Sequence, residues 1–251
     1  MQKYSIFNLI KNALSNHEKW DLAWKDPTPK KEYDVVIIGG GGHGLATAYY
    51  LAKEHNITNV AIIEKGWIGG GNVGRNTTII RSNYMHDENA LFSEFGMNLW
   101  RKMSQDLNYN VMFSPRGIIN LAHSDAQMNA YARRGNSMRL NGIDAVLLNR
   151  EQVKEIIPMA DFSANVRFPI FGGLMQPSAG TARHDAVAWG YARQADSMGV
   201  DIIQNCEVTG FDLSAGKIKG IRTSRGDIKV KKVGLCVAGS TNILAEKLNM
   251  T

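Results

Sequence analysis

The clearest hydrophobic pattern in the chain comes early and is typical of a buried strand. Residues 33–38 (YDVVII) are almost continuously apolar and run directly into a glycine loop, residues 39–44. A helix is expected over about residues 45–54, and a second apolar strand, 59–63, ends at Glu64. This order of strand, helix and strand predicts a βαβ unit with parallel strands.

The middle of the chain has mainly helical patterns. The spacing of Leu91, Phe95, Leu99 and Met103 predicts a helix over residues 91–107 with one buried apolar stripe. A β-hairpin is expected over residues 111–122, with its turn at residues 114–117. Further helices are predicted over residues 125–140, after a cap at Asn149, and over residues 181–198.

The last fifty residues return to strand patterns. Strands are expected over residues 201–208 and 217–223, and from residue 227 on towards residue 239. Short connections between them predict a β-meander. We therefore divide the chain into an arm, the first part of a nucleotide-binding domain, part of an inserted substrate domain, and the second part of the nucleotide-binding domain; their ranges are 1–30, 31–90, 91–170 and 171–251.

The N-terminal arm has its own amphipathic pattern. Ile6, Phe7, Ile10 and Leu14 predict a short helix, and Trp20 and Trp24 follow before the proline-rich break at residues 26–29. Apolar residues on an arm need a surface to cover. That surface belongs either to the same domain or to a partner subunit.

The glycine loop carries the most specific chemistry. In the spacing Gly39-x-Gly41-x-x-Gly44, the glycines allow a tight turn, the approach of a pyrophosphate and close packing of the following helix. The positive end of that helix favours phosphate. Glu64 stands where a carboxylate accepts hydrogen bonds from a ribose diol. We therefore predict an adenosine-dinucleotide site that also includes Gly42, His43 and Lys65.

Composition excludes several other classes of protein. With 44% hydrophobic and 21% charged residues in 251, the chain is neither disordered nor membrane-like. Its N-terminus lacks a secretory pattern, so a cytoplasmic location is expected. Cys206 and Cys236 have no metal-ligand spacing, and we expect no metal site. The net charge of +6 is spread out, without the interleaved aromatic residues of a nucleic-acid platform, so we expect neither nucleic-acid nor membrane partners.

Several motifs in order resemble the FAD-dependent amine oxidases of the glutathione-reductase-like superfamily. These are residues 39–44, Glu64, a second glycine loop at residues 69–71, Val208, and the strand that ends at Gly239. Residues 41–53, 76–84 and 182–189 are especially similar to the β subunits of heterotetrameric sarcosine oxidases. The resemblance implies an α/β fold: an FAD-binding, Rossmann-like doubly wound sheet with a β-meander, plus part of an inserted α+β substrate domain.

The same resemblance implies a chemistry and a set of partners. Members of the family oxidise sarcosine at noncovalent FAD, and electrons pass to FMN and then to oxygen, giving hydrogen peroxide. The one-carbon unit goes to tetrahydrofolate in a partner α subunit, and γ and δ subunits complete the complex. Members of the family are longer than this chain, so the resemblance also implies an N-terminal fragment that lacks part of the substrate cavity.

Specific residues follow from the resemblance. Arg81 corresponds to the arginine that binds the substrate carboxylate; as a structural alternative it pairs with Asp87 or Glu88. His184 corresponds to the histidine that carries FMN covalently; as an alternative it is a capping or buried histidine. The loop expected to contact FAD adds further residues: Gly70, Gly71, Asn72, Arg75, Asn76 and Thr77.

Two other functions stay open. One is a related dehydrogenase for N-methyl amino acids, proline or opines; peroxide formation and covalent FMN separate it from an oxidase. The other is a noncatalytic, flavin-binding assembly subunit, which would show flavin absorbance that no amine bleaches.

Overall fold

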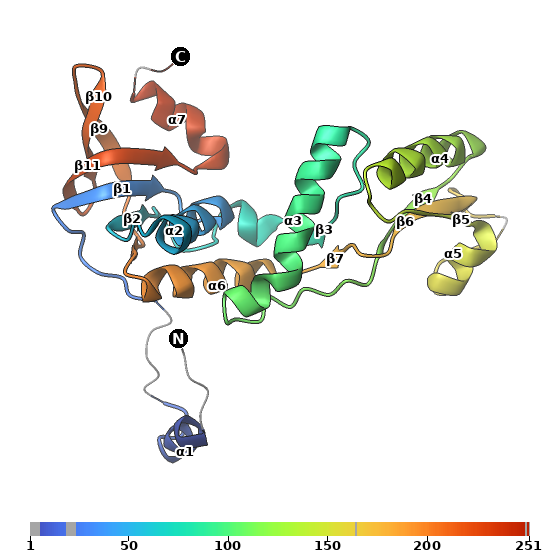
Figure 1. Cartoon of the computed structure of the whole chain (residues 1–251), viewed down its shortest axis with the longest axis horizontal. Helices are drawn as coiled ribbons and strands as arrows, with labels where there is room; N and C mark the ends of the chain where they lie inside the picture. Colours follow the sequence, from blue (N-terminus) through green and yellow to red (C-terminus); the bar gives the residue numbers. More distant parts are fainter. Residues whose placement is uncertain (1–5, 19–23, 164, 249, 251) are drawn as a thin grey trace. The chain divides into compact units, whose positions relative to one another are not determined.

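The structure is a computed structural model that describes residues 6–18, 24–163, 165–248 and 250 (Figure 1). The chain divides into two compact units. Unit 1 comprises the described residues of 1–76, 107–110 and 184–251, and unit 2 those of 77–106 and 111–183. Both units are therefore built from segments that are distant in sequence.

Unit 1 is organised around a six-stranded sheet of order β8-β2-β1-β11-β10-β9. β1 (Glu32–Ile38) lies between β2 (Val60–Ile63) and β11 (Gly226–Leu235) and is parallel to both; β8 (Asp201–Ile203) is parallel to β2. β9 (Val208–Ser214), β10 (Lys217–Thr223) and β11 form an antiparallel meander. The expected α/β class, with a βαβ unit and a meander, is confirmed.

One strand predicted in this region is wrong. Residues 201–208 do not form a single strand, because pairing stops after Ile203 and β9 begins at Val208 on the opposite edge of the sheet. Between them, Asn205 adopts φ +49°, and the backbone N–H of Cys206 donates to the carbonyl of Glu64. This turn redirects the chain, and an apolar pattern alone does not reveal it.

Two helices pack together beside the parallel strands of unit 1. They are α2 (Gly42–His55) and α6 (His184–Ser197), and α6 begins at His184 rather than at residue 181 (Figure 1). Small buried residues, Ala48 on α2 and Ala188 on α6, suit such packing. α6 also packs against the 3-10 helix η1 (Asn72–Arg75), and η2 (Ala238–Ser240) and α7 (Thr241–Glu246) follow the meander.

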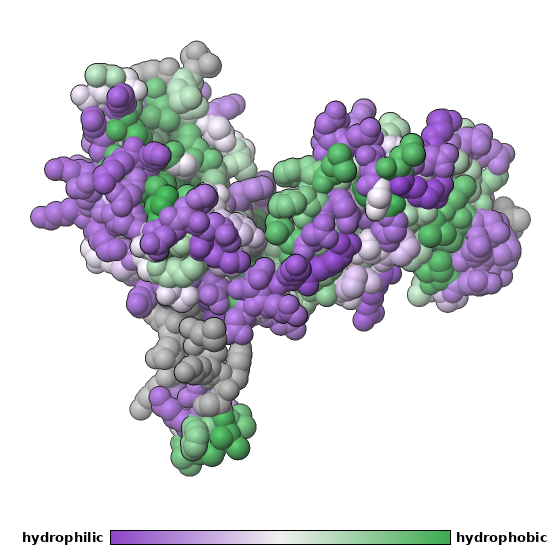
Figure 2. Space-filling view, in the orientation of Figure 1, coloured by the Kyte–Doolittle hydropathy of each residue, from purple (hydrophilic) through white to green (hydrophobic). Residues whose placement is uncertain are grey.

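The arm contains the amphipathic helix that the sequence predicts, α1 (Ile6–Leu14). None of its residues is buried, and Figure 2 shows a largely hydrophobic surface on it. Trp24 is half-buried, whereas Trp20 lies outside the described residues.

Unit 2 contains two small antiparallel sheets. Strands β4 (Ile118–Ala122), β6 (Gly172–Gln176) and β5 (Val146–Asn149) form one, and β3 (Ile79–Ile80) with β7 (Gly180–Thr181) forms the other. α4 (Asp125–Leu140) has the predicted bounds, and a capping box at Asn149 starts α5 (Arg150–Ile156) as expected. No helix in the described part of the chain is long and apolar enough to cross a membrane.

The predicted hairpin at residues 111–122 is wrong. β4 pairs with β6, and Ser114 forms a bridge with Thr181, so both sides of the expected turn pair with the distant segment 172–181. Residues 115–117 form neither a turn nor a bend, although Gly117 has φ +84° and the Arg116 N–H donates to the Ser114 carbonyl at 3.0 Å. Residues typical of turns do not specify which segment a following strand pairs with.

The buried stripe predicted for residues 91–107 is also partly wrong. The helix is present as α3 (Asp87–Asp106) and Met103 is buried, but Leu91 is 54% and Phe95 65% exposed. The buried residues of α3 are Ala90, Met97 and Met103. Helical spacing identifies residues that share a face, but it does not show which part of a protein covers that face.

Candidate flavin and substrate sites

Two glycines of the first loop are required by close backbone contacts. Gly39 has φ +111°, and a side chain there would overlap the carbonyl oxygen of Cys236 at the end of the neighbouring strand. A Cβ atom at Gly44 would overlap the carbonyl oxygen of Gly39. The loop can therefore turn tightly and bring α2 close to β1 only with glycine at both positions.

Of the three glycines between them, Gly41 and Gly42 have room for a Cβ atom. A Cβ atom added at Gly41 would meet only Val73 Cγ2, at 3.9 Å, and one at Gly42 the same atom at 3.4 Å. Gly41 caps α2 without a side-chain hydrogen bond, and His43 in the first turn is exposed. The start of α2 is therefore an accessible backbone surface that suits a phosphate group.

Glu64 is held in place by the main chain on both sides. Its Oε2 accepts a hydrogen bond from the Gly40 N–H at 2.7 Å, and its Oε1 accepts one from the Gly66 N–H at 2.8 Å. Each carboxylate oxygen can accept a further hydrogen bond. Glu64 thus has a fixed orientation and can still accept hydrogen bonds from a ribose diol. The neighbouring Lys65 is exposed.

The second glycine loop is hydrogen-bonded directly to the first. The Gly69 N–H donates to the carbonyl of Gly40 at 3.0 Å. Gly70 packs against the Trp67 ring, which leaves no room for a Cβ atom, whereas a Cβ at Gly71 would have no neighbour within 4 Å. The two loops therefore form one continuous backbone surface beside Glu64.

The polar residues that follow this loop are exposed. Asn72 and Arg75 lie on η1, and Asn76 ends it by donating from Nδ2 to the carbonyl of Val73 at 2.6 Å. Thr77, also exposed, is the first residue of unit 2. Their side chains are accessible to a ligand, which a flavin-contacting loop requires.

Val208 and Gly239 mark the two ends of the meander. The Val208 side chain is 5% exposed and belongs to the core, so only its backbone is suited to contact a dinucleotide. Gly239 lies in η2, where an added Cβ atom would have no neighbour within 4 Å. Both positions offer main chain rather than side chain to a ligand.

His184 is the first residue of α6 and has an unusual ring nitrogen. Its Nδ1 atom is buried and makes no hydrogen bond within the described residues. A buried polar atom without a partner is destabilising, and a group bound there would relieve that penalty.

Arg81 lies in unit 2 just after β3. Its Nη1 donates to Asn83 Oδ1 at 2.5 Å, and its Cζ lies 5.0 Å from the centre of the Tyr84 ring. Among the described residues, the structure shows no ion pair of Arg81 with Asp87 or Glu88, the structural alternative considered above. Its guanidinium therefore has donors left for a carboxylate.

A buried polar network fixes the backbone on which Arg81 sits. Ser82, Asn83 and Gln176 are all fully buried. Gln176 accepts from the Ser82 N–H at 3.0 Å and donates to Ser82 Oγ at 2.7 Å, and Asn83 Nδ2 donates to Asn120 Oδ1 at 2.8 Å. The sequence analysis missed this network, since polar residues in a loop carry no signal of burial.

A second arginine, Arg134 on α4, also contacts this segment. Its guanidinium donates through Nε to the carbonyl of Asn83 at 2.7 Å and through Nη2 to the same oxygen. Burial lowers the pKa of Arg134, and the nearby charge of Arg81 lowers it further. Two guanidinium groups thus lie close together around Asn83, and this positive cluster favours an anion such as a carboxylate.

Comparison with known proteins agrees with this geometry. The sequence profile of the family described as "FAD dependent oxidoreductase" matches residues 34–251, which include both glycine loops and Glu64. The chain belongs to this family. FAD is therefore the dinucleotide for which a site was predicted, and the FAD-dependent oxidoreductase fold accounts for the sheet and the meander of unit 1.

Individual relatives of this FAD-dependent oxidoreductase are close in sequence. It is 59% identical over 244 residues to the sarcosine oxidase subunit beta of Rhizobium meliloti and 52% identical over 245 residues to that of Rhodobacter capsulatus. These matches cover 97% and 98% of this chain but 58% and 59% of the relatives. The chain thus spans less than two thirds of their length.

A solved structure of the same fold is that of an L-proline dehydrogenase from P. horikoshii. It superimposes with a TM-score of 0.82 at 26% sequence identity, and the match covers 89% of this chain and 57% of that one.

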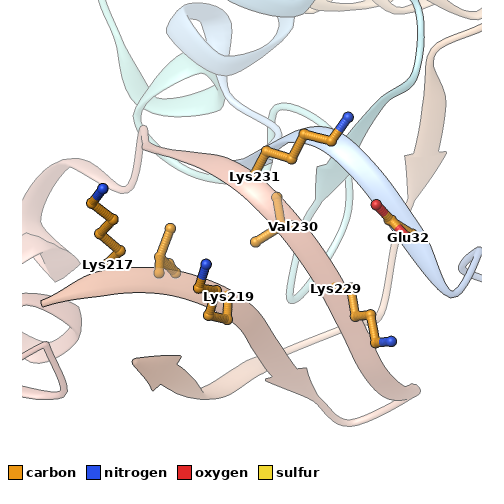
Figure 3. Close-up of a pocket in the computed structure, with 7 residues that line it drawn as sticks. Glu32, Lys217, Lys219, Lys229, Val230 and Lys231 are labelled. Carbon is orange, nitrogen blue, oxygen red and sulfur yellow. The ribbon is translucent and has the colours of Figure 1, made fainter. Parts of the chain in front are cut away.

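A separate hollow of about 500 Å³ lies on the meander of this FAD-dependent oxidoreductase. Figure 3 shows Lys217 and Lys219 on β10, Lys229 and Lys231 on β11, and Glu32 on β1 around it. Lys231 forms an ion pair with Asp34 at 2.5 Å, which holds the pKa of Asp34 below its usual value. The glycine loops, Glu64 and His184 do not line this hollow, so it is distinct from the candidate flavin site.

Proposed function

We propose that the protein is the flavin-carrying β subunit of a sarcosine oxidase and takes part in the oxidation of sarcosine to glycine. The observation that carries this proposal is the Arg81 guanidinium, which has donors left for a carboxylate in a chain 59% identical to a sarcosine oxidase subunit beta. Sarcosine is a small amino acid whose carboxylate such an arginine would bind bidentately.

In this proposal the two units bind different ligands. Unit 1 would bind FAD noncovalently: the backbone at Gly41 and Gly42 would hold the pyrophosphate, Glu64 the ribose, and residues 70–76 would lie along the flavin. Unit 2 would orient the substrate through Arg81. When bound, FAD supplies a ring that accepts a hydride from the N-methyl carbon. The main task of the protein is then to hold the amine in the reactive orientation.

The substrate anchor follows from the cluster around Asn83. Arg81 would bind the carboxylate, and Asn83 would keep the guanidinium in a fixed orientation through its Oδ1 atom. Arg134, which donates to the Asn83 carbonyl, would fix the backbone and add positive charge. Binding the carboxylate at this cluster would leave the methylamino end of sarcosine directed away from it.

His184 would be the attachment point of a second flavin, FMN. The buried Nδ1 atom has no hydrogen-bond partner among the described residues. It therefore fits a covalently bound group, because a bond to this nitrogen would leave no unsatisfied polar atom there. For the nitrogen to act as a nucleophile, the imidazole ring must be neutral. We expect the His184→Ala variant to retain FAD but to lose flavin that survives denaturation.

The complete reaction would require partner subunits. In this proposal the electrons pass to FMN and then to oxygen, giving hydrogen peroxide, and the one-carbon unit reaches tetrahydrofolate in an α subunit, with γ and δ subunits completing the complex. A cytoplasmic location fits the free thiols of Cys206 and Cys236, which are stable in a reducing compartment.

A second candidate is a proline dehydrogenase subunit, which the fold similarity to the L-proline dehydrogenase of P. horikoshii favours. Anaerobic addition of sarcosine or proline to the flavin-loaded complex separates the two. We expect sarcosine to bleach the visible flavin absorbance at much lower concentration than proline. Preferential bleaching by proline would favour the dehydrogenase, and bleaching by no amine would favour a noncatalytic assembly subunit.

A further inference from the structure

Gln204 connects the end of β8 to the second glycine loop. It directly follows Ile203, the last residue of β8, and its Oε1 accepts a hydrogen bond from the Ile68 N–H at 2.9 Å. Gln204 and Ile68 are 136 residues apart in the chain. Ile68 is only 5% exposed, and a buried N–H group needs an acceptor within the protein. The side chain of Gln204 supplies that acceptor.

This contact lies next to the backbone that is proposed to face the flavin. The residue after Ile68 is Gly69, whose N–H donates to the carbonyl of Gly40 in the first glycine loop at 3.0 Å. Two residues further on, Gly71 is the position where an added Cβ atom would have no neighbour within 4 Å. A displacement of Ile68 would therefore be transmitted directly to the open backbone of the second loop.

Gln204 and Glu64 lie at the same edge of the sheet, because they follow the parallel strands β8 and β2. Ligands of open α/β sheets bind beyond this carboxyl edge. The Glu64 N–H donates to the Ile203 carbonyl, and the Cys206 N–H donates to the Glu64 carbonyl, both at 2.9 Å. These main-chain bonds hold Glu64, whereas the bond to Ile68 comes from a side chain. A substitution of Gln204 can therefore release the second loop without releasing Glu64.

Gln204 is itself held on both sides of its main chain. Its N–H donates to Asp26 Oδ1 at 3.1 Å, and its carbonyl accepts from Arg225 Nη1 at 3.1 Å. Asp26 precedes β1, and Arg225 lies between β10 and β11. The two form an ion pair at 3.2 Å, but both are partly exposed, so the pair alone contributes little to stability. Its effect is to fix the main chain of Gln204.

We propose that Gln204 is a positioning residue of the FAD site: it holds the second glycine loop against the flavin through Ile68, while Asp26 and Arg225 hold Gln204. This inference rests on the proposed function, because only that proposal places residues 70–76 along the flavin. Gln204 acts without touching FAD. The segment before β1 thereby contributes to the retention of a cofactor that binds at the opposite end of the strands.

The test compares two replacements of Gln204 with a matched control. Gln204→Leu keeps the approximate size of the side chain but removes the acceptor, and Gln204→Glu keeps an acceptor oxygen at the same reach. The control is Gln194→Leu on α6, also in unit 1. Gln194 is half-buried like Gln204, and its Nε2 donates to the Leu107 carbonyl at 2.7 Å. Both leucine variants thus lose one hydrogen bond from a side chain to the main chain of a distant segment.

The quantity measured is the rate at which FAD leaves the flavin-loaded protein, followed by stopped-flow fluorescence, with Tm of the apoprotein recorded for each variant. We expect Gln204→Leu to release FAD about fivefold faster or more, as the loss of one hydrogen bond implies. Gln204→Glu and Gln194→Leu should stay within about twofold of the unaltered protein. The two leucine variants should have similar Tm values, so a difference in FAD release cannot come from stability.

Asp26→Ala tests the second half of the proposal. It should accelerate FAD release by less than Gln204→Leu does, because the bond to Ile68 remains. Combined with Gln204→Leu, it should add nothing, since Asp26 acts through Gln204. Additive effects of the two substitutions would show that Asp26 acts independently and would overturn this half.

Unchanged FAD release from Gln204→Leu, or equally fast release from Gln194→Leu or Gln204→Glu, would overturn the role of Gln204. Gly71→Ala, which places a methyl group in the open space of the loop itself, separates this result from the proposed function. If Gly71→Ala accelerates FAD release and Gln204→Leu does not, the positioning role is wrong while the loop remains a flavin contact. If neither variant does, both proposals are wrong. Acceleration by Gln204→Leu alone would mean that Gln204 does not act through this loop, which also overturns the inference.

Discussion

The two glycine loops of unit 1 and the Arg81 segment of unit 2, for which we propose ligand sites, are built by opposite means. In unit 1 the ligand surface is main chain: Gly41, Gly42 and Gly71 leave space, and backbone N–H groups orient Glu64. In unit 2 the surface is a side chain, and buried side chains hold it in place. A backbone site therefore depends on residues that are small, and a side-chain site on residues that form specific hydrogen bonds.

The difference predicts which substitutions damage the fold and which damage only a ligand site. A methyl group placed where two backbone segments touch should destabilise unit 1 itself. The same methyl group placed where the backbone faces open space should affect only the ligand. In unit 2, an exchange of one polar atom should affect substrate binding without affecting FAD.

The largest effect is expected for Gly44→Ala. Its Cβ atom would overlap the Gly39 carbonyl oxygen, so α2 must move away from the sheet. We expect a loss of about 3 kcal/mol or more in the free energy of unfolding. Thermal unfolding followed by circular dichroism would show it as a drop of roughly 6–12 °C in Tm. An unchanged Tm would mean that the close approach of these two residues is not required.

The next largest effect is expected for Gly41→Ala, which should weaken FAD binding without destabilising the fold. The nearest atom to an added Cβ is 3.9 Å away, so the fold has room for it. If the pyrophosphate lies against this glycine, FAD affinity should fall at least tenfold, or about 1.4 kcal/mol. FAD released on gel filtration measures this loss, with Tm of the apoprotein as the control. Full FAD retention would place the pyrophosphate elsewhere.

Asn83→Asp tests the side-chain site. The new carboxylate would pair with Arg81 and neutralise the charge that should bind the substrate. We expect the KM for sarcosine to rise about 10-fold while FAD content stays the same, since a hydrogen bond to a charged group contributes about 1.5–3 kcal/mol. Asn89→Asp, an exposed position on α3, is the matched control. Equal KM values in both variants would show that Asn83 does not contribute to the substrate site.

The smallest effect is expected for Glu64→Gln. The amide retains one acceptor, but its NH2 group would face the N–H of either Gly40 or Gly66, so the side chain loses one of two backbone hydrogen bonds. We expect FAD to dissociate several times faster, in keeping with about 1 kcal/mol for one hydrogen bond. Stopped-flow fluorescence would measure the rate, and Glu54→Gln on the exposed surface of α2 is the control.

The local geometry of the proposed backbone site could be predicted from the sequence more fully than that of the proposed side-chain site, for a physical reason. The contact that requires glycine at position 44 is with Gly39 in the same loop, so this part of the pattern and its consequence lie within one short segment. The contact of Gly39 with Cys236 is long-range, but the glycine spacing predicts the turn without it. Glu64 could be predicted as well, because it ends the next strand of the same βαβ unit. The two helix caps at Gly41 and Asn149 are likewise local features.

The network around Arg81 depends instead on residues far apart in the chain. Gln176 lies 94 residues from Ser82, and Arg134 lies 51 residues from Asn83. Nothing in a polar loop residue indicates that a distant segment will bury it. The errors over the hairpin at 111–122 and the stripe on α3 have the same origin, because both depended on which distant segment, if any, covers a strand or a helix.

One experiment on two variants tests the central claim that separate parts of the chain hold FAD and substrate. FAD content and the sarcosine concentration that half-bleaches the flavin under anaerobic conditions are measured for the complex carrying Gly41→Ala or Arg81→Lys. The account predicts that Gly41→Ala loses FAD, and that Arg81→Lys keeps it but needs about 10- to 100-fold more sarcosine, because lysine cannot bind a carboxylate bidentately. Loss of FAD in Arg81→Lys, or an unchanged sarcosine concentration for half-bleaching in that variant, would contradict it.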